Sequence, residues 1–123
     1  MDVNQTFLPL LWKAQGTIVH IDSIASFASI PWCSIYCASK AALYAYCDTL
    51  RLEVASLEVK VVYIQTRTIK SNMTASRNTI ATNSLYAPMR KAYEESRKTD
   101  GELGVTTEAY AKEVVENLLS PGS

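Results

Sequence analysis

The sequence predicts an α/β protein whose parallel strands are joined by a helical crossover. Two short β-branched runs, residues 17–21 and 59–64, lie on either side of a long Ala- and Leu-rich segment, residues 34–57. The runs are typical of buried strands, and the segment between them is typical of a helix. A strand, a crossover helix and a second strand form a βαβ unit with parallel pairing and a right-handed connection. Two strands cannot cover both faces and both edges of a sheet, so we expect an incomplete sheet in this chain.

Local signals define the elements before the long helix. Apolar positions in residues 5–14 favour a helix, and Gly16 is its stop signal. The run at 17–21 then predicts the first strand, buried on both faces. Residues 22–33 are rich in Ser and Ala and contain Pro31, which predicts a loop.

The segments after the second strand are more polar. Residues 65–84 are rich in Thr, Ser and Asn and predict a long loop, whereas residues 85–97 have helical spacing with interleaved charges. A final amphipathic helix begins at Thr106 or Thr107, either of which can act as its N-cap, and ends near Leu119. No internal repeat or linker divides the sequence, so we expect one domain at most.

The charge balance excludes some classes of partner. Twelve Lys and Arg oppose twelve Asp and Glu among 123 residues, so the formal net charge is zero. We therefore expect no nucleic-acid partner. The apolar run at residues 7–12 is too short to cross a bilayer and lacks a basic flank, which predicts no transmembrane segment and no signal peptide. We expect a cytoplasmic protein.

The cysteines and the histidine do not form a metal-binding pattern. Cys33, Cys37 and Cys47 are an odd set without a second ligand pair, and His20 is the one histidine. We expect no metal site, and we expect reduced thiols that pack as small hydrophobic groups. His20 ends the first strand and is either a ligand or base or a hydrogen-bonded structural residue, of which we favour the structural role.

Tyr36 and Lys40 are the residues that point most directly to chemistry. They are four residues apart at the start of the long helix, so they share one helical face. A tyrosine ordinarily has a pKa of about 10, and a nearby cation favours its phenolate, which transfers protons better at neutral pH. Ser23 lies thirteen residues before Tyr36, just after the first strand. Ligands collect at the carboxyl ends of parallel strands, so this hydroxyl is placed to bind a substrate carbonyl that the tyrosine protonates.

Such a pair in an arbitrary sequence is usually a solvated helical pair. The order of strand, serine, loop, helix start and second strand favours the catalytic interpretation, because independent signals agree. Four longer segments, residues 16–25, 36–43, 48–53 and 59–62, resemble the short-chain dehydrogenase/reductase family. Three others, residues 44–51, 83–88 and 107–111, are similar to the fungal branch of that family that reduces 1-acyldihydroxyacetone phosphate with NADPH. The resemblance covers nearly the whole chain.

The resemblance implies a fold, a reaction and an assembly. The fold would be the C-terminal part of a Rossmann-like, doubly wound parallel sheet. Ser23 would orient the carbonyl of a small-molecule or lipid-like ketone, and Tyr36 would protonate its oxygen as hydride arrives from NADPH. Lys40 would hold the ribose hydroxyls of the cofactor and favour the tyrosinate. The helix starting near Ser34 is commonly part of a dimer interface in this family, which implies a homo-oligomer, and the branch implies association with lipid droplets or the endoplasmic reticulum.

The turn after the second strand implies further cofactor contacts. Thr66, Ile69 and Ser71 match family positions at the nicotinamide end of the cofactor, where its carboxamide or phosphate is bound. Arg67 and Thr68 occupy places where the family has glycine, which permits close backbone approach. The turn therefore departs from the family pattern between matching flanks.

Two further departures define which part of the family domain is expected. None of the four glycines forms the Gly-rich strand-to-helix turn that cradles a pyrophosphate. We therefore expect residues 1-123 to be the catalytic, C-terminal part of the domain, N-terminally truncated and lacking the dinucleotide-binding part. Asn4 resembles the active-site asparagine of the family but is several residues too close to the following segment, so it is either a relic of a deletion or a chance match.

Three functions stay open from the sequence. The first is an NADP-dependent oxidoreductase that reduces a ketone through Ser23, Tyr36 and Lys40. The second is a truncated relative without turnover, indicated by the missing Gly-rich turn. The third is an interaction module that pairs through its long helix, whose apolar surface is left without a sheet to cover it.

Overall fold

The computed structural model describes residues 3–71 and 79–120. By its internal contacts the chain divides into two units, unit 1 (Met1–Thr66) and unit 2 (Arg67–Ser123). Each contains one small parallel sheet of two strands. The predicted α/β fold class with parallel pairing is therefore confirmed.

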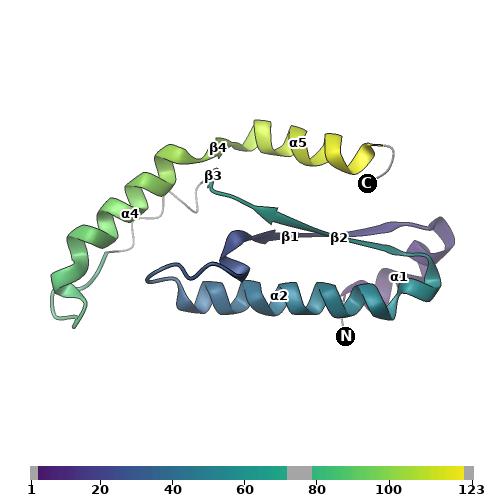
Figure 1. Ribbon diagram of the computed structural model, residues 1–123, viewed down its shortest axis with the longest axis horizontal. Coiled ribbons are helices and arrows are strands. Elements are labelled where there is room, and N and C mark those ends of the chain that lie inside the picture. Colours follow the sequence, from purple (N-terminus) through teal and green to yellow (C-terminus); the bar gives the residue numbers. More distant parts are fainter. Residues whose placement is uncertain (1–2, 72–78, 121–123) are drawn as a thin grey trace. The chain divides into compact units, whose positions relative to one another are not determined.

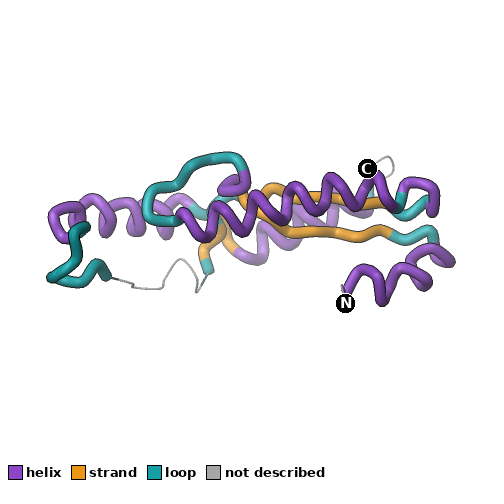
Figure 2. Tube along the Cα trace, turned by 90° about the horizontal axis from the view of Figure 1, so that it is seen from below, coloured by secondary structure: helices purple, strands orange, loops and turns teal. Residues whose placement is uncertain are grey.

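Unit 1 contains the predicted βαβ arrangement preceded by a helix. Its elements are α1 (Val3–Ala14), β1 (Thr17–Ser23), the 3-10 turn η1 (Ile24–Ser26), α2 (Ser34–Glu53), the 3-10 turn η2 (Ala55–Leu57) and β2 (Lys60–Thr66). The two strands pair in parallel, from Thr17 opposite Lys60 to Ser23 opposite Thr66. Helix α2 runs along this strand pair (Figure 1; Figure 2), so it connects the two strands and also covers one of their faces.

A small apolar core joins α2 to the strands. Its buried members are Ile18, Leu50, Val54, Val59 and Val61, and Leu8, Leu11, Tyr46 and Leu57 pack against them. On the other face of β1, Val19 is 37% exposed and Ile21 is 46% exposed. The prediction of a strand buried on both faces was therefore wrong, because α2 covers only the face that carries Ile18.

Helix α1 ends as its sequence predicts, with one difference. The Gly16 N–H donates to the Leu11 carbonyl at 2.8 Å, which closes the last turn of the helix. The left-handed residue at this end is Gln15, with a φ of 46°, rather than the glycine that usually takes this conformation. Gly16 therefore marks the helix end without itself supplying the positive φ.

Strand β1 continues into the predicted loop and includes Asp22 and Ser23. The prediction of a loop from residue 22 was wrong here, because a charged residue at this position finds partners inside unit 1. The Ser23 hydroxyl oxygen then accepts the Ala25 N–H at 3.2 Å and caps η1. The remaining part of 22–33, up to the start of α2, is the irregular connection that was expected.

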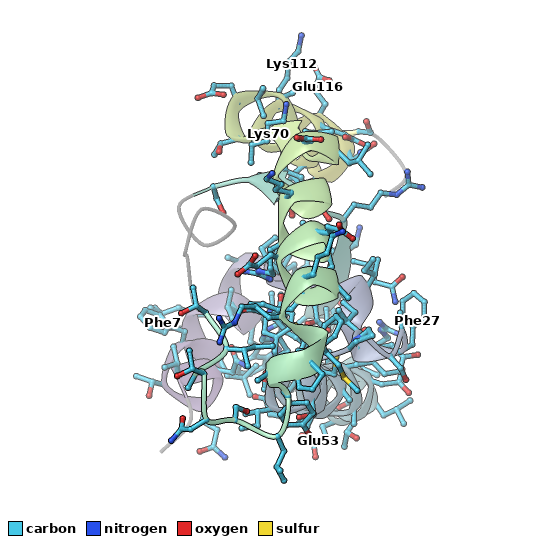
Figure 3. The ribbon with its side chains drawn as sticks, turned by 90° about the vertical axis from the view of Figure 1, so that its left-hand side faces the viewer. Phe7, Phe27, Glu53, Lys70, Lys112 and Glu116 are labelled. Carbon is cyan, nitrogen blue, oxygen red and sulfur yellow. The ribbon has the colours of Figure 1, made fainter. Side chains whose placement is uncertain are left out.

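Unit 2 holds the second sheet and two helices. Its elements are β3 (Ile69–Lys70), the 3-10 turn η3 (Ala87–Met89), α4 (Arg90–Leu103), β4 (Val105–Thr106) and α5 (Thr107–Leu119). On α5 the charges of Lys112 and Glu116, one turn apart, approach to 3.8 Å (Figure 3). The helix predicted over 85–97 is present but begins later, after η3.

Neither short strand of unit 2 was predicted. Strand β3 lies within the predicted loop 65–84, and it pairs in parallel with β4, where Ile69 is opposite Val105. A strand of two residues has no periodicity that a sequence can show. Close approach of the two strands depends on Gly104, where a Cβ atom would lie 2.9 Å from the backbone nitrogen of Lys70.

Replacing Thr106 with alanine is expected to destabilise α5 by about 1 kcal/mol. The Thr106 side chain is the N-cap of this helix and accepts the Ala109 N–H at 3.2 Å. Circular dichroism during urea unfolding measures the loss, and Thr106→Ser is the matched control because it keeps the capping oxygen. Equal urea midpoints for the alanine and serine variants would contradict the capping role.

Candidate active site

The structure places the three predicted catalytic residues in unit 1. Ser23 ends β1, while Tyr36 and Lys40 lie one turn apart near the start of α2. The Lys40 Nζ atom is 5.9 Å from the centroid of the Tyr36 ring and donates to the Ile21 carbonyl at 3.4 Å. The lysine therefore joins the start of α2 to the carboxyl end of β1, where the serine was predicted to act.

Two hydroxyl groups of this region keep a free hydrogen among the residues that the structure describes. The Ser23 oxygen accepts the Ala25 N–H, but no described residue accepts its hydrogen, and the half-buried Tyr36 hydroxyl has no described hydrogen-bond partner. Both groups can donate to an oxygen atom of a ligand without breaking an existing hydrogen bond. That is the requirement for binding and protonating a carbonyl.

Asp22 is the residue of this region that the sequence did not single out. It is 2% exposed, and its Oδ1 atom lies 3.4 Å from the Lys40 Nζ. The contact is an ion pair without hydrogen-bond geometry, since Oδ1 has no hydrogen-bond partner among the described residues. The signal in the sequence was the alternation of Ile18, His20 and Asp22 on the face that α2 covers, opposite a helix that carries a lysine.

Tyr63 and Ser26 extend the polar contacts of Asp22. The Tyr63 hydroxyl donates to Asp22 Oδ2 at 2.5 Å and lies 2.8 Å from the Ser26 hydroxyl. Ser26 donates in turn to the Ser23 carbonyl at 2.8 Å. The ring of Tyr44, one turn after Lys40 on α2, packs against the Tyr63 ring with 5.1 Å between centroids. These contacts connect both strands and α2 at one end of the sheet.

Two groups near Asp22 have perturbed proton affinities. Burial raises the pKa of the Cys47 thiol above its ordinary 9.0, and the charge of Asp22 adds to the effect. Burial also raises the pKa of Tyr63 above its ordinary 10.0, as does the hydrogen bond that its neutral form donates to Asp22. Cys47 is 1% exposed, so the prediction that it packs as a small hydrophobic group is confirmed.

The free energy of unfolding is expected to fall as the pH rises above about 9. Cys47 and Tyr63 have raised pKa values only in the folded protein. Their contribution to the free energy of unfolding is fully present below the pKa values of the unfolded chain. It is lost as the pH rises through the pKa values of the folded protein, because the unfolded chain releases these protons first. Urea midpoints at about pH 8 and about pH 10.5 measure the effect. Cys47→Ala should reduce the difference, and equal midpoints for the unsubstituted chain would contradict the expectation.

The predicted cofactor-binding residues are divided between the units. Thr66 ends β2, directly opposite Ser23 in the strand register, and is buried. Ile69 lies in β3 and Ser71 just beyond it, so both belong to unit 2. The structure therefore places Thr66 at the same end of the strand pair as Ser23. Ile69 and Ser71 belong to the other unit.

Asn4 and His20 contact the same residue of α2. The Asn4 side-chain amide donates to the Tyr46 hydroxyl at 2.8 Å, which links α1 to α2. The His20 ring meets the Tyr46 ring edge-on, with 5.8 Å between centroids. The predicted hydrogen-bonded role of His20 is not supported, because its buried Nε2 atom has no hydrogen-bond partner among the described residues. A packing contact with Tyr46 takes the place of that hydrogen bond.

A pocket of about 310 Å³ lies beside the polar contacts of Asp22 and is lined by Ser26, Phe27, Tyr44 and Gln65. Among the described residues, no group of three or more His, Cys, Asp or Glu side chains is arranged to hold a metal ion. In the same described part of the chain, no helix is long and apolar enough to span a membrane.

Comparison with known proteins places these residues in a family. The short chain dehydrogenase profile matches residues 1–81. The NADPH-dependent 1-acyldihydroxyacetone phosphate reductase of Schizosaccharomyces pombe is 36% identical over 126 residues, covering 98% of this chain and 42% of that protein. Its namesake in Saccharomyces cerevisiae is also 36% identical, over 89% of this chain and 38% of that protein.

A further relative is the short-chain dehydrogenase ptmH of Penicillium ochrochloron, which is 35% identical over 94% of this chain and 43% of that protein. The chain thus spans about two fifths of the length of the curated relatives it matches. The matched profile and the identity along nearly the whole chain agree with the parallel α/β architecture. The chain belongs to the short-chain dehydrogenase/reductase family of oxidoreductases.

Proposed function

We propose that this chain is the catalytic part of an NADPH-dependent reductase that converts a ketone on a lipid-like substrate, of the 1-acyldihydroxyacetone phosphate kind, into an alcohol. The observation that carries the proposal is the position of the Lys40 ammonium, which lies beside the Tyr36 ring and bonds to the carboxyl end of β1, where Ser23 ends the strand. The two fungal relatives named for this reaction support the choice of substrate class.

The residues of unit 1 have separate roles in this proposal. The Ser23 hydroxyl donates a hydrogen bond to the carbonyl oxygen and orients the substrate. The Tyr36 hydroxyl transfers its proton to the same oxygen as negative charge develops there. Lys40 binds the ribose hydroxyls of the cofactor, and its positive charge stabilises the tyrosinate that remains. A reduced nicotinamide, when bound, would supply the hydride for the carbonyl carbon.

The donors of the site fit the nicotinamide end of such a cofactor. The lysine ammonium has three N–H groups, of which one donates to the Ile21 carbonyl and another faces Asp22. The Lys40 side chain is 23% exposed, so its remaining N–H group can reach a ribose hydroxyl. We include Thr66, Ile69 and Ser71 as further contacts of this end. The pyrophosphate has no Gly-rich turn among these residues, and we propose that the dinucleotide-binding part of the domain supplies it.

The experiment is a titration of the purified chain with NADPH, followed by fluorescence, and then an assay of NADPH absorbance with a 1-acyldihydroxyacetone phosphate. We expect weak but saturable binding, because the chain lacks the turn that cradles the pyrophosphate, and substrate-dependent loss of absorbance. NADH serves as the comparison cofactor, and a reaction mixture without the substrate serves as the blank. Saturable binding without turnover would leave the second interpretation, a relative that does not catalyse the reaction. No binding at all would contradict the reductase proposal.

A helix-mediated association is the second candidate, because α2 presents an apolar stripe to solvent. Exposed small or apolar side chains recur every three or four residues along it, which places them on one face. They are Ile35, Ala38, Ala42, Ala45, Thr49 and Leu52. Ile35 is 85% exposed and Leu52 is 77% exposed. We propose a homo-oligomer through this face, which sedimentation velocity tests; a monomer at every concentration would contradict it.

We also propose a cytoplasmic location at the surface of lipid droplets or the endoplasmic reticulum, where a lipid-like ketone is presented. The support for this location is the lipid-like substrate in the names of the two fungal reductases. A fluorescent fusion that stays away from both compartments would contradict it.

A further inference from the structure

We propose that Asp22 is a positioning residue of this site, a buried counter-ion that holds the ammonium of Lys40 at the carboxyl end of β1. The meaning of this role for catalysis rests on the proposed reductase function, whereas the ion pair itself does not. The side chain of Asp22 is 0% exposed, and its Oδ1 atom lies 3.4 Å from the Lys40 Nζ. A buried carboxylate without a compensating charge is strongly unfavourable, and Lys40 is the cation that the described structure places beside it.

The second oxygen of the carboxylate is held by one neutral donor. The Tyr63 hydroxyl donates to Oδ2 and also contacts the hydroxyl of Ser26. Tyr44 packs its ring on Tyr63, which restrains the phenol from the side of α2. The carboxylate is therefore fixed by hydrogen bonding at one oxygen, while the other oxygen is left for the ammonium. Oδ1 has no hydrogen-bond partner among the described residues, so its interaction there is with the charge of Lys40.

A fixed carboxylate also determines where the lysine points. Lysine is a point charge on a flexible four-carbon stem, and ordering that stem has an entropic cost. In this structure the stem begins on α2 and its ammonium ends between the Ile21 carbonyl and Asp22, both on β1. These two contacts hold the ammonium near the Tyr36 ring. The charged groups and titratable groups that face Asp22 are Lys40, Tyr63 and Cys47.

Replacing Asp22 with asparagine removes the charge and keeps the shape. The amide oxygen of asparagine can still accept from Tyr63, so the variant separates the ion pair from the packing. The readout is the rate at which acetic anhydride modifies each lysine, measured by mass spectrometry, because an amine held in an ion pair is less accessible to the reagent. We expect Lys40 to react about threefold faster, or more, in Asp22→Asn, relative to the exposed Lys13 of the same chain.

Tyr63→Phe is the matched control, because it disturbs the same contacts and retains the carboxylate. Its effect on Lys40 reactivity should be clearly smaller than that of Asp22→Asn. An unchanged ratio of Lys40 to Lys13 reactivity in Asp22→Asn, with unchanged circular dichroism, would overturn the proposal. An equal increase in both variants would also overturn it, because a loosened structure would then explain the result.

A second measurement tests the proposal if the Asp22→Asn variant does not fold. Lys40→Met leaves the buried carboxylate without its cation, so its urea midpoint should lie well below that of Lys13→Met, which removes an exposed lysine. Equal midpoints would overturn the proposal. Neither measurement uses NADPH or turnover. If the chain binds no NADPH but the variants differ in lysine reactivity and urea midpoint as expected, the reductase proposal is contradicted and the ion pair is supported. If the chain binds NADPH but the variants do not differ, only the ion-pair proposal is contradicted.

Discussion

Replacing Tyr36 with phenylalanine is expected to lower kcat for ketone reduction by at least about 100-fold. The substitution removes the proposed proton donor and leaves the ring in place, so the packing near Lys40 is preserved. A positioned general acid contributes roughly 100-fold to 10,000-fold to a reaction of this kind. The assay follows the loss of NADPH absorbance at saturating substrate, and the affinity for NADPH is measured separately by fluorescence titration.

Tyr86→Phe is the control for this substitution. Tyr86 is 59% exposed in unit 2 and is assigned no role in the proposed chemistry, so the loss of its hydroxyl group should leave kcat unchanged. In Tyr36→Phe the affinity for NADPH should change much less than kcat, because the ribose hydroxyls are assigned mainly to Lys40. A variant that retains more than about a tenth of the activity would exclude Tyr36 as the proton donor.

Replacing Leu50 with alanine is expected to lower the free energy of unfolding of unit 1 by about 2–4 kcal/mol. Leu50 is 8% exposed and lies in the cluster that joins α2 to both strands through Ile18 and Val61. Its truncation removes buried apolar surface and leaves a cavity that so small a core cannot refill from other side chains. A loss of this size is a large fraction of the stability of a small domain.

Leu52→Ala is the matched control, because it makes the same chemical change two residues further along the same helix. Leu52 is 77% exposed, so its truncation should change the free energy of unfolding by less than about 0.5 kcal/mol. Urea unfolding followed by circular dichroism measures both variants. Similar urea midpoints for Leu50→Ala and Leu52→Ala would mean that the core of unit 1 is not organised around Leu50.

The two substitutions separate the proposed chemistry from the scaffold that supports it. Tyr36→Phe should affect turnover with little effect on unfolding, and Leu50→Ala should affect unfolding first. Both positions lie on α2, which carries Tyr36 and Lys40 near its start and Leu50 near its end. This helix therefore holds the candidate site and the core in one rigid element, and damage to the core is expected to disturb the site as well.

The sequence determined the elements whose signals are local. The β-branched runs became β1 and β2, the Ala- and Leu-rich segment became α2, and Thr106 caps α5 as its residue type predicts. Helical spacing also placed Tyr36 and Lys40 on one face, because residues four apart are neighbours in any α-helix. These features depend on residues that are close together in the chain, which is why the sequence alone predicts them.

The tertiary structure decided the features that depend on distant partners. The Ser- and Ala-rich composition of residues 22–33 predicted a loop from Asp22 onward, yet β1 continues through it, because Lys40 and Tyr63 approach from other elements. Asp22 and Tyr63 are 41 residues apart, and the pairing of β3 with β4 likewise joins segments that no local pattern connects. A buried charge is stable only beside its counter-ion. The candidate catalytic site, with Lys40 held beside Asp22, forms only when folding brings these groups together.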